Sequence, residues 1–152
     1  MKNLFIFIIS IYSISGCSEK KSERALINKF INEIKFNKEF NFLDSKKYII
    51  YNSMNLKKEE VISLLINENI KLLRKNLSKN DSIKIFTHNE LIKNQINFSF
   101  NYKDYSKVYY VIGDNRNVIT TIIVDSKKII SFSYNIIKNI NKPKTPLLLN
   151  EI

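Results

Sequence analysis

The chain has 152 residues, with 25 Lys+Arg against 14 Asp+Glu and a formal net charge of +11. Its length is that of one ordinary domain, and its 44% apolar residues supply a core, which excludes a disordered chain. Cys17 is the only cysteine, so an intramolecular disulfide is excluded. The basic charge favours anionic surfaces, but no compact run of Lys and Arg with interleaved aromatic residues marks a nucleic-acid-binding protein, so nucleic acid is not an expected partner.

Residues 1–16 are expected to form a signal peptide that is cleaved. Lys2 supplies a positive charge, and the apolar run from Leu4 to Ile14 is too short to cross a bilayer core of about 30 Å as a helix. The sequence Ile14-Ser15-Gly16-Cys17 resembles the lipobox of bacterial lipoproteins, in which the cysteine is acylated and becomes the mature N-terminus. This resemblance implies lipidation of Cys17, with palmitate among the acyl chains. It also implies a place in the bacterial cell envelope, in the outer membrane if the organism has one and otherwise on the outer face of the plasma membrane.

The expected mature chain has three parts. Residues 17–23 contain the lipidated cysteine and a polar stretch without apolar periodicity, which predicts a tether of about 20 Å when extended. Residues 24–140 are expected to form a single domain. Residues 141–152 contain both prolines and are expected to form an extended tail.

Helices are expected in the first half of the domain. Apolar residues at helical spacing from Leu26 to Ile34 predict an amphipathic helix with Ser22 as its N-cap. Between Phe36 and Met54 a short helix and an irregular connection both stay open. From Asn55 to about Ser78 a longer helix is expected, with an apolar stripe wide enough to lie under a sheet. The stripe consists of Val61, Ile62, Leu64, Leu65, Ile66, Leu72, Leu73 and Leu77.

Strands are expected after Asp81, where the apolar period changes to two. In the run from Ile96 to Tyr102, Phe98 and Phe100 should face the core while Asn97 and Asn101 face away. The expected strands are residues 83–86, 96–102, 108–112, 118–124 and 129–136, separated by turn sequences.

The order of these elements predicts an α+β domain in which N-terminal helices are packed on one face of a curved four- or five-stranded antiparallel meander. This order resembles the cystatin-like and nuclear-transport-factor-2-like folds. The resemblance implies a scaffold used by binding proteins and by a few isomerases and hydrolases, so the fold alone does not define a function.

Four residues are candidates for lining a pocket between the sheet and the helices: His88, Tyr102, Tyr110 and Tyr134. A pocket lined by aromatic side chains with a few polar groups would suit an apolar or amphipathic ligand. The alternatives are a filled core for the tyrosines and an ordinary surface or strand-end position for the only histidine. No metal site or cofactor is expected, because a lone histidine lacks a second zinc ligand nearby in the sequence.

Two functions are open. The absence of clustered acids, bases and nucleophiles in the sequence favours a membrane-anchored lipoprotein whose domain binds a protein, a lipid or a cell-wall polymer without catalysis. The alternative is a small enzyme of a nuclear-transport-factor-2-like type that uses His88 or a tyrosine for proton transfer. This enzyme requires His88 to converge with a carboxylate such as Glu90 or Asp104 at the mouth of a cavity.

Anionic lipid headgroups or an envelope protein are the expected partners besides the membrane itself. Lysines that follow a short tether lie close to the bilayer, where each is attracted by anionic lipid. The lysines expected over the headgroups are Lys29, Lys35, Lys38, Lys46 and Lys47.

Overall fold

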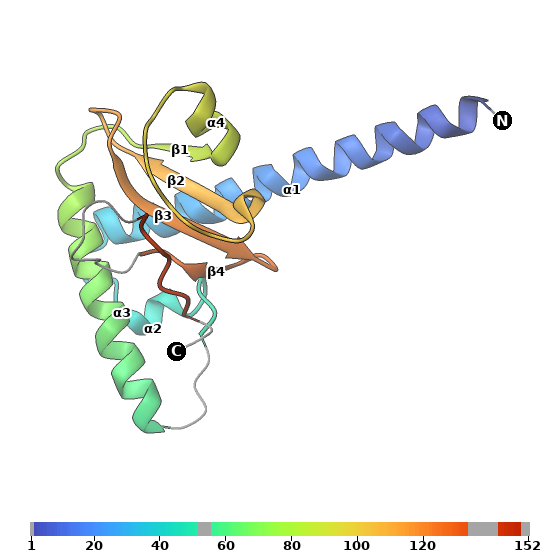
Figure 1. Ribbon diagram of the computed structural model, residues 1–152. Coiled ribbons are helices and arrows are strands. Elements are labelled where there is room, and N and C mark those ends of the chain that lie inside the picture. The colour runs from blue at the N-terminus through green and yellow to red at the C-terminus, as the bar shows by residue number, and fades with distance from the viewer. Residues whose placement is uncertain (1, 52–55, 134–142, 150–152) are drawn as a thin grey trace.

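The computed structural model describes residues 2–51, 56–133 and 143–149, with only the backbone for residues 2–17 and 56–58. Three helices come first along the chain, and four strands and a short helix follow (Figure 1). The elements are α1 (Lys2–Phe36), α2 (Phe42–Ser45), α3 (Leu56–Leu77), β1 (Lys84–Thr87), α4 (His88–Lys93), the 3-10 helix η1 (Tyr105–Lys107), β2 (Val108–Ile112), β3 (Val118–Asp125) and β4 (Lys128–Ser131).

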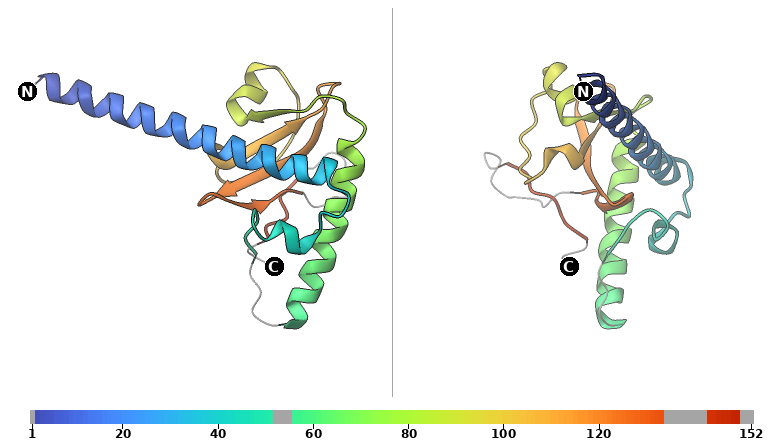
Figure 2. Two further views of the ribbon diagram at one scale, coloured as in Figure 1. Left: turned by 180° about the vertical axis from the view of Figure 1, so that it is seen from behind. Right: turned by 90° about the vertical axis from the view of Figure 1, so that its right-hand side faces the viewer.

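The strands form one antiparallel sheet in the order β1-β2-β3-β4. Its register pairs Ile85 with Val111 and Tyr109 with Ile122. Helices α1 and α3 pack on one face of this sheet, which Figure 2 shows from behind. The predicted α+β fold, with N-terminal helices on an antiparallel meander, is therefore confirmed.

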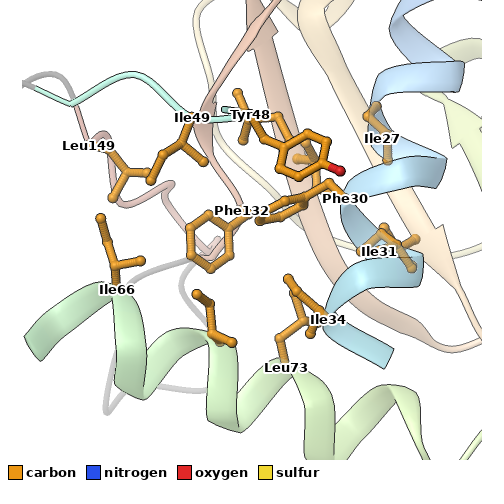
Figure 3. Close-up of a cluster of buried hydrophobic side chains, with 14 of the residues drawn as sticks. Ile27, Phe30, Ile31, Ile34, Tyr48, Ile49, Ile66, Leu73, Phe132 and Leu149 are labelled. Carbon is orange, nitrogen blue, oxygen red and sulfur yellow. The ribbon is translucent and has the colours of Figure 1, made fainter. Parts of the chain in front are cut away.

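A cluster of buried side chains between α1, α3 and the sheet forms what we call the helix-side core (Figure 3). Phe30 of α1 is at its centre, with ring centroids 6.0 Å from Phe40, 5.6 Å from Tyr48 and 5.2 Å from Phe132. These rings come from α1, the segment after α1 and the end of the sheet. The residues of α1 and α3 in the cluster follow helical spacing: Ile27, Phe30, Ile31, Ile34, Ile62, Ile66, Ile70, Leu73 and Leu77.

The apolar stripe predicted for α3 is only partly buried. Val61, Leu64 and Leu72 are 62%, 68% and 52% exposed, respectively. The predicted positions extend around more than half of the helix, whereas α1 and the sheet cover one side of it. The second side of α3 therefore presents apolar side chains to solvent.

The other face of the sheet is also covered, by α4, the segment of residues 94–107 and the end of the chain. We call this second cluster the loop-side core. Because both faces are covered, all five residues of β2 are buried. The buried members of the loop-side core are Leu91, Phe100, Val108, Tyr110, Ile112, Ile123 and Ile130.

The outer edge of β4 pairs with two segments from elsewhere in the chain. Ile49 forms a parallel bridge with Ile129, and the amide of Ile50 donates to the carbonyl oxygen of Ile129 at 3.0 Å. The amide of Leu149 donates to the carbonyl oxygen of Ile130 at 2.8 Å. Residues on both sides of α3 in the sequence thus complete the hydrogen bonds of this strand.

The strand predicted from Ile96 to Tyr102 is wrong. This segment forms no strand, and its one ladder contact is a parallel bridge between Phe100 and Lys144. Phe100 is buried, Phe98 is half-buried, and Asn97 and Asn101 are exposed, as the alternation predicts. An extended backbone turns successive side chains to opposite sides even where it crosses a sheet face without joining the ladder.

Two strand ends also differ from expectation. Thr87 ends β1 and caps α4, so His88 begins a helix rather than ending a strand. Strand β4 ends at Ser131, short of the predicted end at residue 136, and residues 134–136 lie outside the described part of the chain.

The start predicted for the first helix is wrong as well. Helix α1 continues unbroken through residues 17–23, where a tether with Ser22 as N-cap was expected. This stretch contains neither Gly nor Pro, and helix formers such as Glu19, Lys20 and Lys21 let α1 continue. Six helical residues span about 9 Å, half the expected tether. Figure 1 shows the N-terminal part of α1 projecting beyond the sheet.

Phe100→Ala is expected to lower the free energy of unfolding by about 3–5 kcal/mol, because it leaves a cavity in the loop-side core. Phe98→Ala should cost less, since Phe98 is half-buried, and the exposed Asn97→Ala control should change stability by less than about 0.5 kcal/mol. Urea denaturation measures all three. Equal losses for Phe100→Ala and Asn97→Ala would contradict this packing.

Candidate functional site

Charged residues shortly after the lipobox-like sequence connect α1 to the sheet. Lys20 Nζ donates to the carbonyl oxygen of Ser106 and lies 5.2 Å from the centroid of the Tyr109 ring. The Tyr109 hydroxyl donates to the carboxylate of Glu23. Burial, followed by this hydrogen bond, raises the pKa of Tyr109, so its hydroxyl stays a donor at neutral pH. We call Lys20, Glu23 and Arg24 the α1 junction.

Arg24 connects α1 to the corner between β1 and α4. Its guanidinium forms an ion pair with Glu90 and donates to the carbonyl oxygen of Ile85 at 3.2 Å. Glu90 also accepts from the amide and hydroxyl of Thr87, at 2.8 and 3.0 Å, in the capping box of α4. Burial opposes ionisation of Glu90, but the hydrogen bonds from Thr87 and Arg24 outweigh it and lower the pKa of this carboxyl.

The α1 junction sets the position of Cys17 relative to the domain. Cys17 precedes Lys20 by three residues in one continuous helix, which is about 4.5 Å along its axis. The residue expected to carry lipid therefore lies at the edge of the folded domain. Sequence reasoning assigned Lys20 and Glu23 to a tether and missed their role. Their spacing with Arg24, at i, i+3 and i+4, is the helical signal that could have identified them.

The structure brings together two of the four predicted pocket residues. His88 Nδ1 lies 2.9 Å from the hydroxyl oxygen of Tyr110, and the His88 ring stacks on Tyr105 with centroids 4.2 Å apart. Tyr102 packs against the same loop-side core, and Tyr134 lies outside the described residues. Burial, with a smaller contribution from the neighbouring Tyr105, raises the pKa of Tyr110, so this phenol is no tyrosinate nucleophile at neutral pH.

The carboxylates proposed as partners of His88 are bound elsewhere. Glu90 is held by Thr87 and Arg24, whereas Asp104 accepts hydrogen bonds from the amide and hydroxyl of Ser106 at 3.0 and 2.6 Å. The His88 side chain therefore takes part in an aromatic and hydroxyl contact within the loop-side core. This arrangement gives His88 a packing role for which no acid partner is needed.

Four hollows among the described residues are lined by side chains other than His88, Tyr102 and Tyr110. One of about 90 Å³ lies between α3 and the end of the sheet, beside Leu73 and Phe132. Another, of about 160 Å³, opens between β1, the β2–β3 turn and the segment after α4, over an apolar floor. Its floor consists of Phe86, Ile96 and Ile112.

Polar groups beside the hollow of about 160 Å³ hold the β2–β3 turn in place. The Asp114 carboxylate accepts from the amides of Asp81 and Ser82 at 2.6 and 2.9 Å. The hydrogen bond from the Ser82 hydroxyl, followed by those from the amides of Ser82 and Asp81, lowers the pKa of Asp114. The Asn80 side chain accepts from the Asp114 amide at 3.0 Å and packs so closely that a Cβ on Gly113 would lie 2.0 Å from Asn80 Oδ1.

No group of three or more His, Cys, Asp and Glu residues that could hold a metal ion occurs among the described residues. Within the same part of the chain, no helix combines the length and apolar character needed to cross a membrane. The chain matches no protein-family model, no curated protein and no solved structure.

Acid should weaken the α1 junction through Glu90. A lowered pKa in the folded state means that the ionised carboxylate stabilises the fold fully above its ordinary value of 4.5 and loses this effect as the pH falls through the folded value. We expect the free energy of unfolding to fall less steeply below pH 4.5 in Glu90→Gln than in the wild type, measured by urea denaturation. As a control, Glu68→Gln on the exposed side of α3 should leave the slope of the wild type unchanged.

Gly113→Ala should lower the free energy of unfolding by about 1–3 kcal/mol, because the added methyl group displaces the Asn80 side chain. In a double-mutant cycle, Asn80→Ala should remove most of the further cost of Gly113→Ala, since the clash is with the Asn80 side chain. Additive losses in thermal or urea denaturation would contradict this contact.

Proposed function

We propose that this chain is a membrane-anchored lipoprotein of the bacterial cell envelope, held by acyl chains on Cys17, with a non-enzymatic binding domain. The observation that supports this most is the continuity of α1, which runs from the lipobox-like sequence into the helix-side core. Ile27, Phe30 and Ile34 of this helix are fully buried. Lipid on Cys17 would therefore hold the folded domain itself at the bilayer, because α1 cannot leave the domain without opening its core.

The number of acyl chains decides how firmly such an anchor holds. A single chain binds a membrane only marginally, whereas two or more hold a protein stably. The lipobox-like sequence favours this kind of anchor, since a lipobox cysteine carries more than one chain. The basic domain adds attraction to anionic lipid on top of the anchor.

The surface around α2 and the start of α3 suits a binding partner. Leu43 is 69% exposed beside an open hollow that Phe42 and Ser63 also line. Val61 and Leu64 are also exposed on α3, but they are not among the residues that line this hollow. Exposed apolar side chains that gather on a surface are typical of protein interaction sites. This surface supports a domain that binds rather than converts its partner.

The contacts of His88 also favour a binding module over an enzyme. An acid–base site needs a titratable group within reach of a substrate and a partner that orients it. His88 contacts Tyr110 and Tyr105, and the nearest candidate acids, Glu90 and Asp104, bind Arg24, Thr87 and Ser106 instead. No specific contact among the described residues favours the enzyme.

Cys17→Ser should abolish acylation, because serine lacks the thiol that forms the thioether. Cells producing the wild type and supplied with an alkyne analogue of palmitate should yield labelled protein, with a matching gain in intact mass. Cys17→Ser should yield none, while the neighbouring Ser18→Ala control should be labelled like the wild type. An unlabelled wild type, or label that persists in Cys17→Ser, would overturn the anchor at Cys17.

A further inference from the structure

We propose that the edge of the domain beside Cys17 lies against the anionic headgroups of the bilayer. This inference rests on the lipid anchor proposed above. The edge comprises residues 18–22 of α1, the segment of residues 103–107 that includes η1, and the β3–β4 turn of residues 125–128. We call these three segments the membrane edge.

Contacts between side chains join the three segments of the membrane edge. Lys20 donates to the carbonyl oxygen of Ser106, which connects α1 to η1. Lys107 pairs with Asp125 at 2.7 Å, which connects η1 to the β3–β4 turn. The segments are far apart in the sequence, but these contacts make them neighbours, and α1 connects them to Cys17.

The membrane edge carries more positive than negative charge. Its six lysines outnumber its three carboxylates, and two of those carboxylates are already satisfied. Asp125 pairs with Lys107, while Asp104 accepts hydrogen bonds from Ser106. Lys21, Lys103 and Lys127 are exposed and form no ion pair with any described residue. These three ammonium groups are the ones available to anionic lipid.

Among the lysines of α1, those of the membrane edge lie nearer to Cys17 along the helix than Lys29 and Lys35 do. Lys20 is about 4.5 Å from Cys17 along the axis of α1, which is within a screening length of about 8 Å at physiological salt. Lys29 and Lys35 are about 18 and 27 Å away along the same helix. A surface next to the lipid-bearing residue is therefore the one that acyl chains bring against the headgroups.

The lysines expected from the sequence differ from those of the membrane edge. Lys46 pairs with Glu59 at 2.8 Å, and Lys47 pairs with Glu33 at 3.4 Å. The charges of Lys46 and Lys47 are therefore compensated within the domain, whereas Lys21 and Lys103 form no ion pair with any described residue.

The test uses the full lipidated protein, reconstituted in vesicles. Because the thiol of Cys17 is acylated, a second cysteine gives one site for a fluorophore. Lys103→Cys places the fluorophore on the membrane edge, and Lys75→Cys places it on α3 as a matched control. Vesicles of phosphatidylcholine, with or without phosphatidylglycerol, also contain a lipid with a nitroxide on its headgroup, which quenches only nearby fluorophores.

We expect the fluorophore at residue 103 to be quenched more strongly in vesicles with phosphatidylglycerol than in vesicles without it. Raising the ionic strength from about 0.01 to about 0.15 M should remove most of this difference, since the screening length falls from about 30 to about 8 Å. The fluorophore at residue 75 should be quenched weakly and equally in both vesicles.

Charge variants test the surface directly. Adding Lys21→Gln and Lys127→Gln to the labelled protein should lower quenching at residue 103 to the level in vesicles without phosphatidylglycerol. Adding Lys71→Gln and Lys79→Gln removes the same charge elsewhere and should leave quenching unchanged. Equal quenching at residues 103 and 75, or equal effects of the two double substitutions, would overturn the membrane edge. Loss of the acyl mass from the wild type would instead overturn the anchor at Cys17, so the two failures are distinguishable.

Discussion

The burial of one face of α1 is the constraint on which the rest of the structure depends. Phe30 contacts aromatic rings from the segment after α1 and from the end of the sheet, so one side chain joins regions separated by about two thirds of the chain. Contacts between rings whose centroids lie 5.2 to 6.0 Å apart add to the stabilisation that comes from removing apolar area from water. Helix α3 packs against both α1 and β3, so the buried face of α1 belongs to one core that holds both helices on the sheet.

Polar contacts then determine where α1 points. Apolar packing is non-directional, whereas the hydrogen bond of Glu23 with the buried Tyr109 hydroxyl and the pairing of Arg24 with Glu90 fix the rotation of the helix about its own axis. These contacts lie between the lipobox-like sequence and the helix-side core. The side chains of the α1 junction, Lys20, Glu23 and Arg24, thus determine the orientation of the domain relative to Cys17.

Much of this fold is predictable from the sequence, because the spacing of apolar residues indicates which side chains are buried. The stripes of α1 and α3 and the apolar runs of β2 and β3 give their elements directly. The spacing of apolar residues does not show which backbone groups form hydrogen bonds. The alternation of apolar and polar residues around Phe98 and Phe100 therefore predicted a strand, whereas an extended segment crosses the sheet there. Residues 18–23 have no apolar periodicity, so periodicity misses the helix that their helix formers allow and that contacts with Ser106 and Tyr109 support. The contact of His88 with Tyr110 likewise depends on the end of β1 at Thr87, which places His88 beside Tyr110 of β2.

The segments that pair with the outer edge of β4 affect how neighbouring copies of the chain can associate. A strand with unpaired amides and carbonyls is a template for another chain, and natural sheets block such edges. The segment at Ile49 and Ile50 and the amide of Leu149 occupy this edge. If Cys17 carries lipid as proposed, copies confined to a membrane surface would collide often in two dimensions. Because Ile129 and Ile130 are already engaged, a neighbouring copy would have to displace these segments before it could pair with β4 at these two residues.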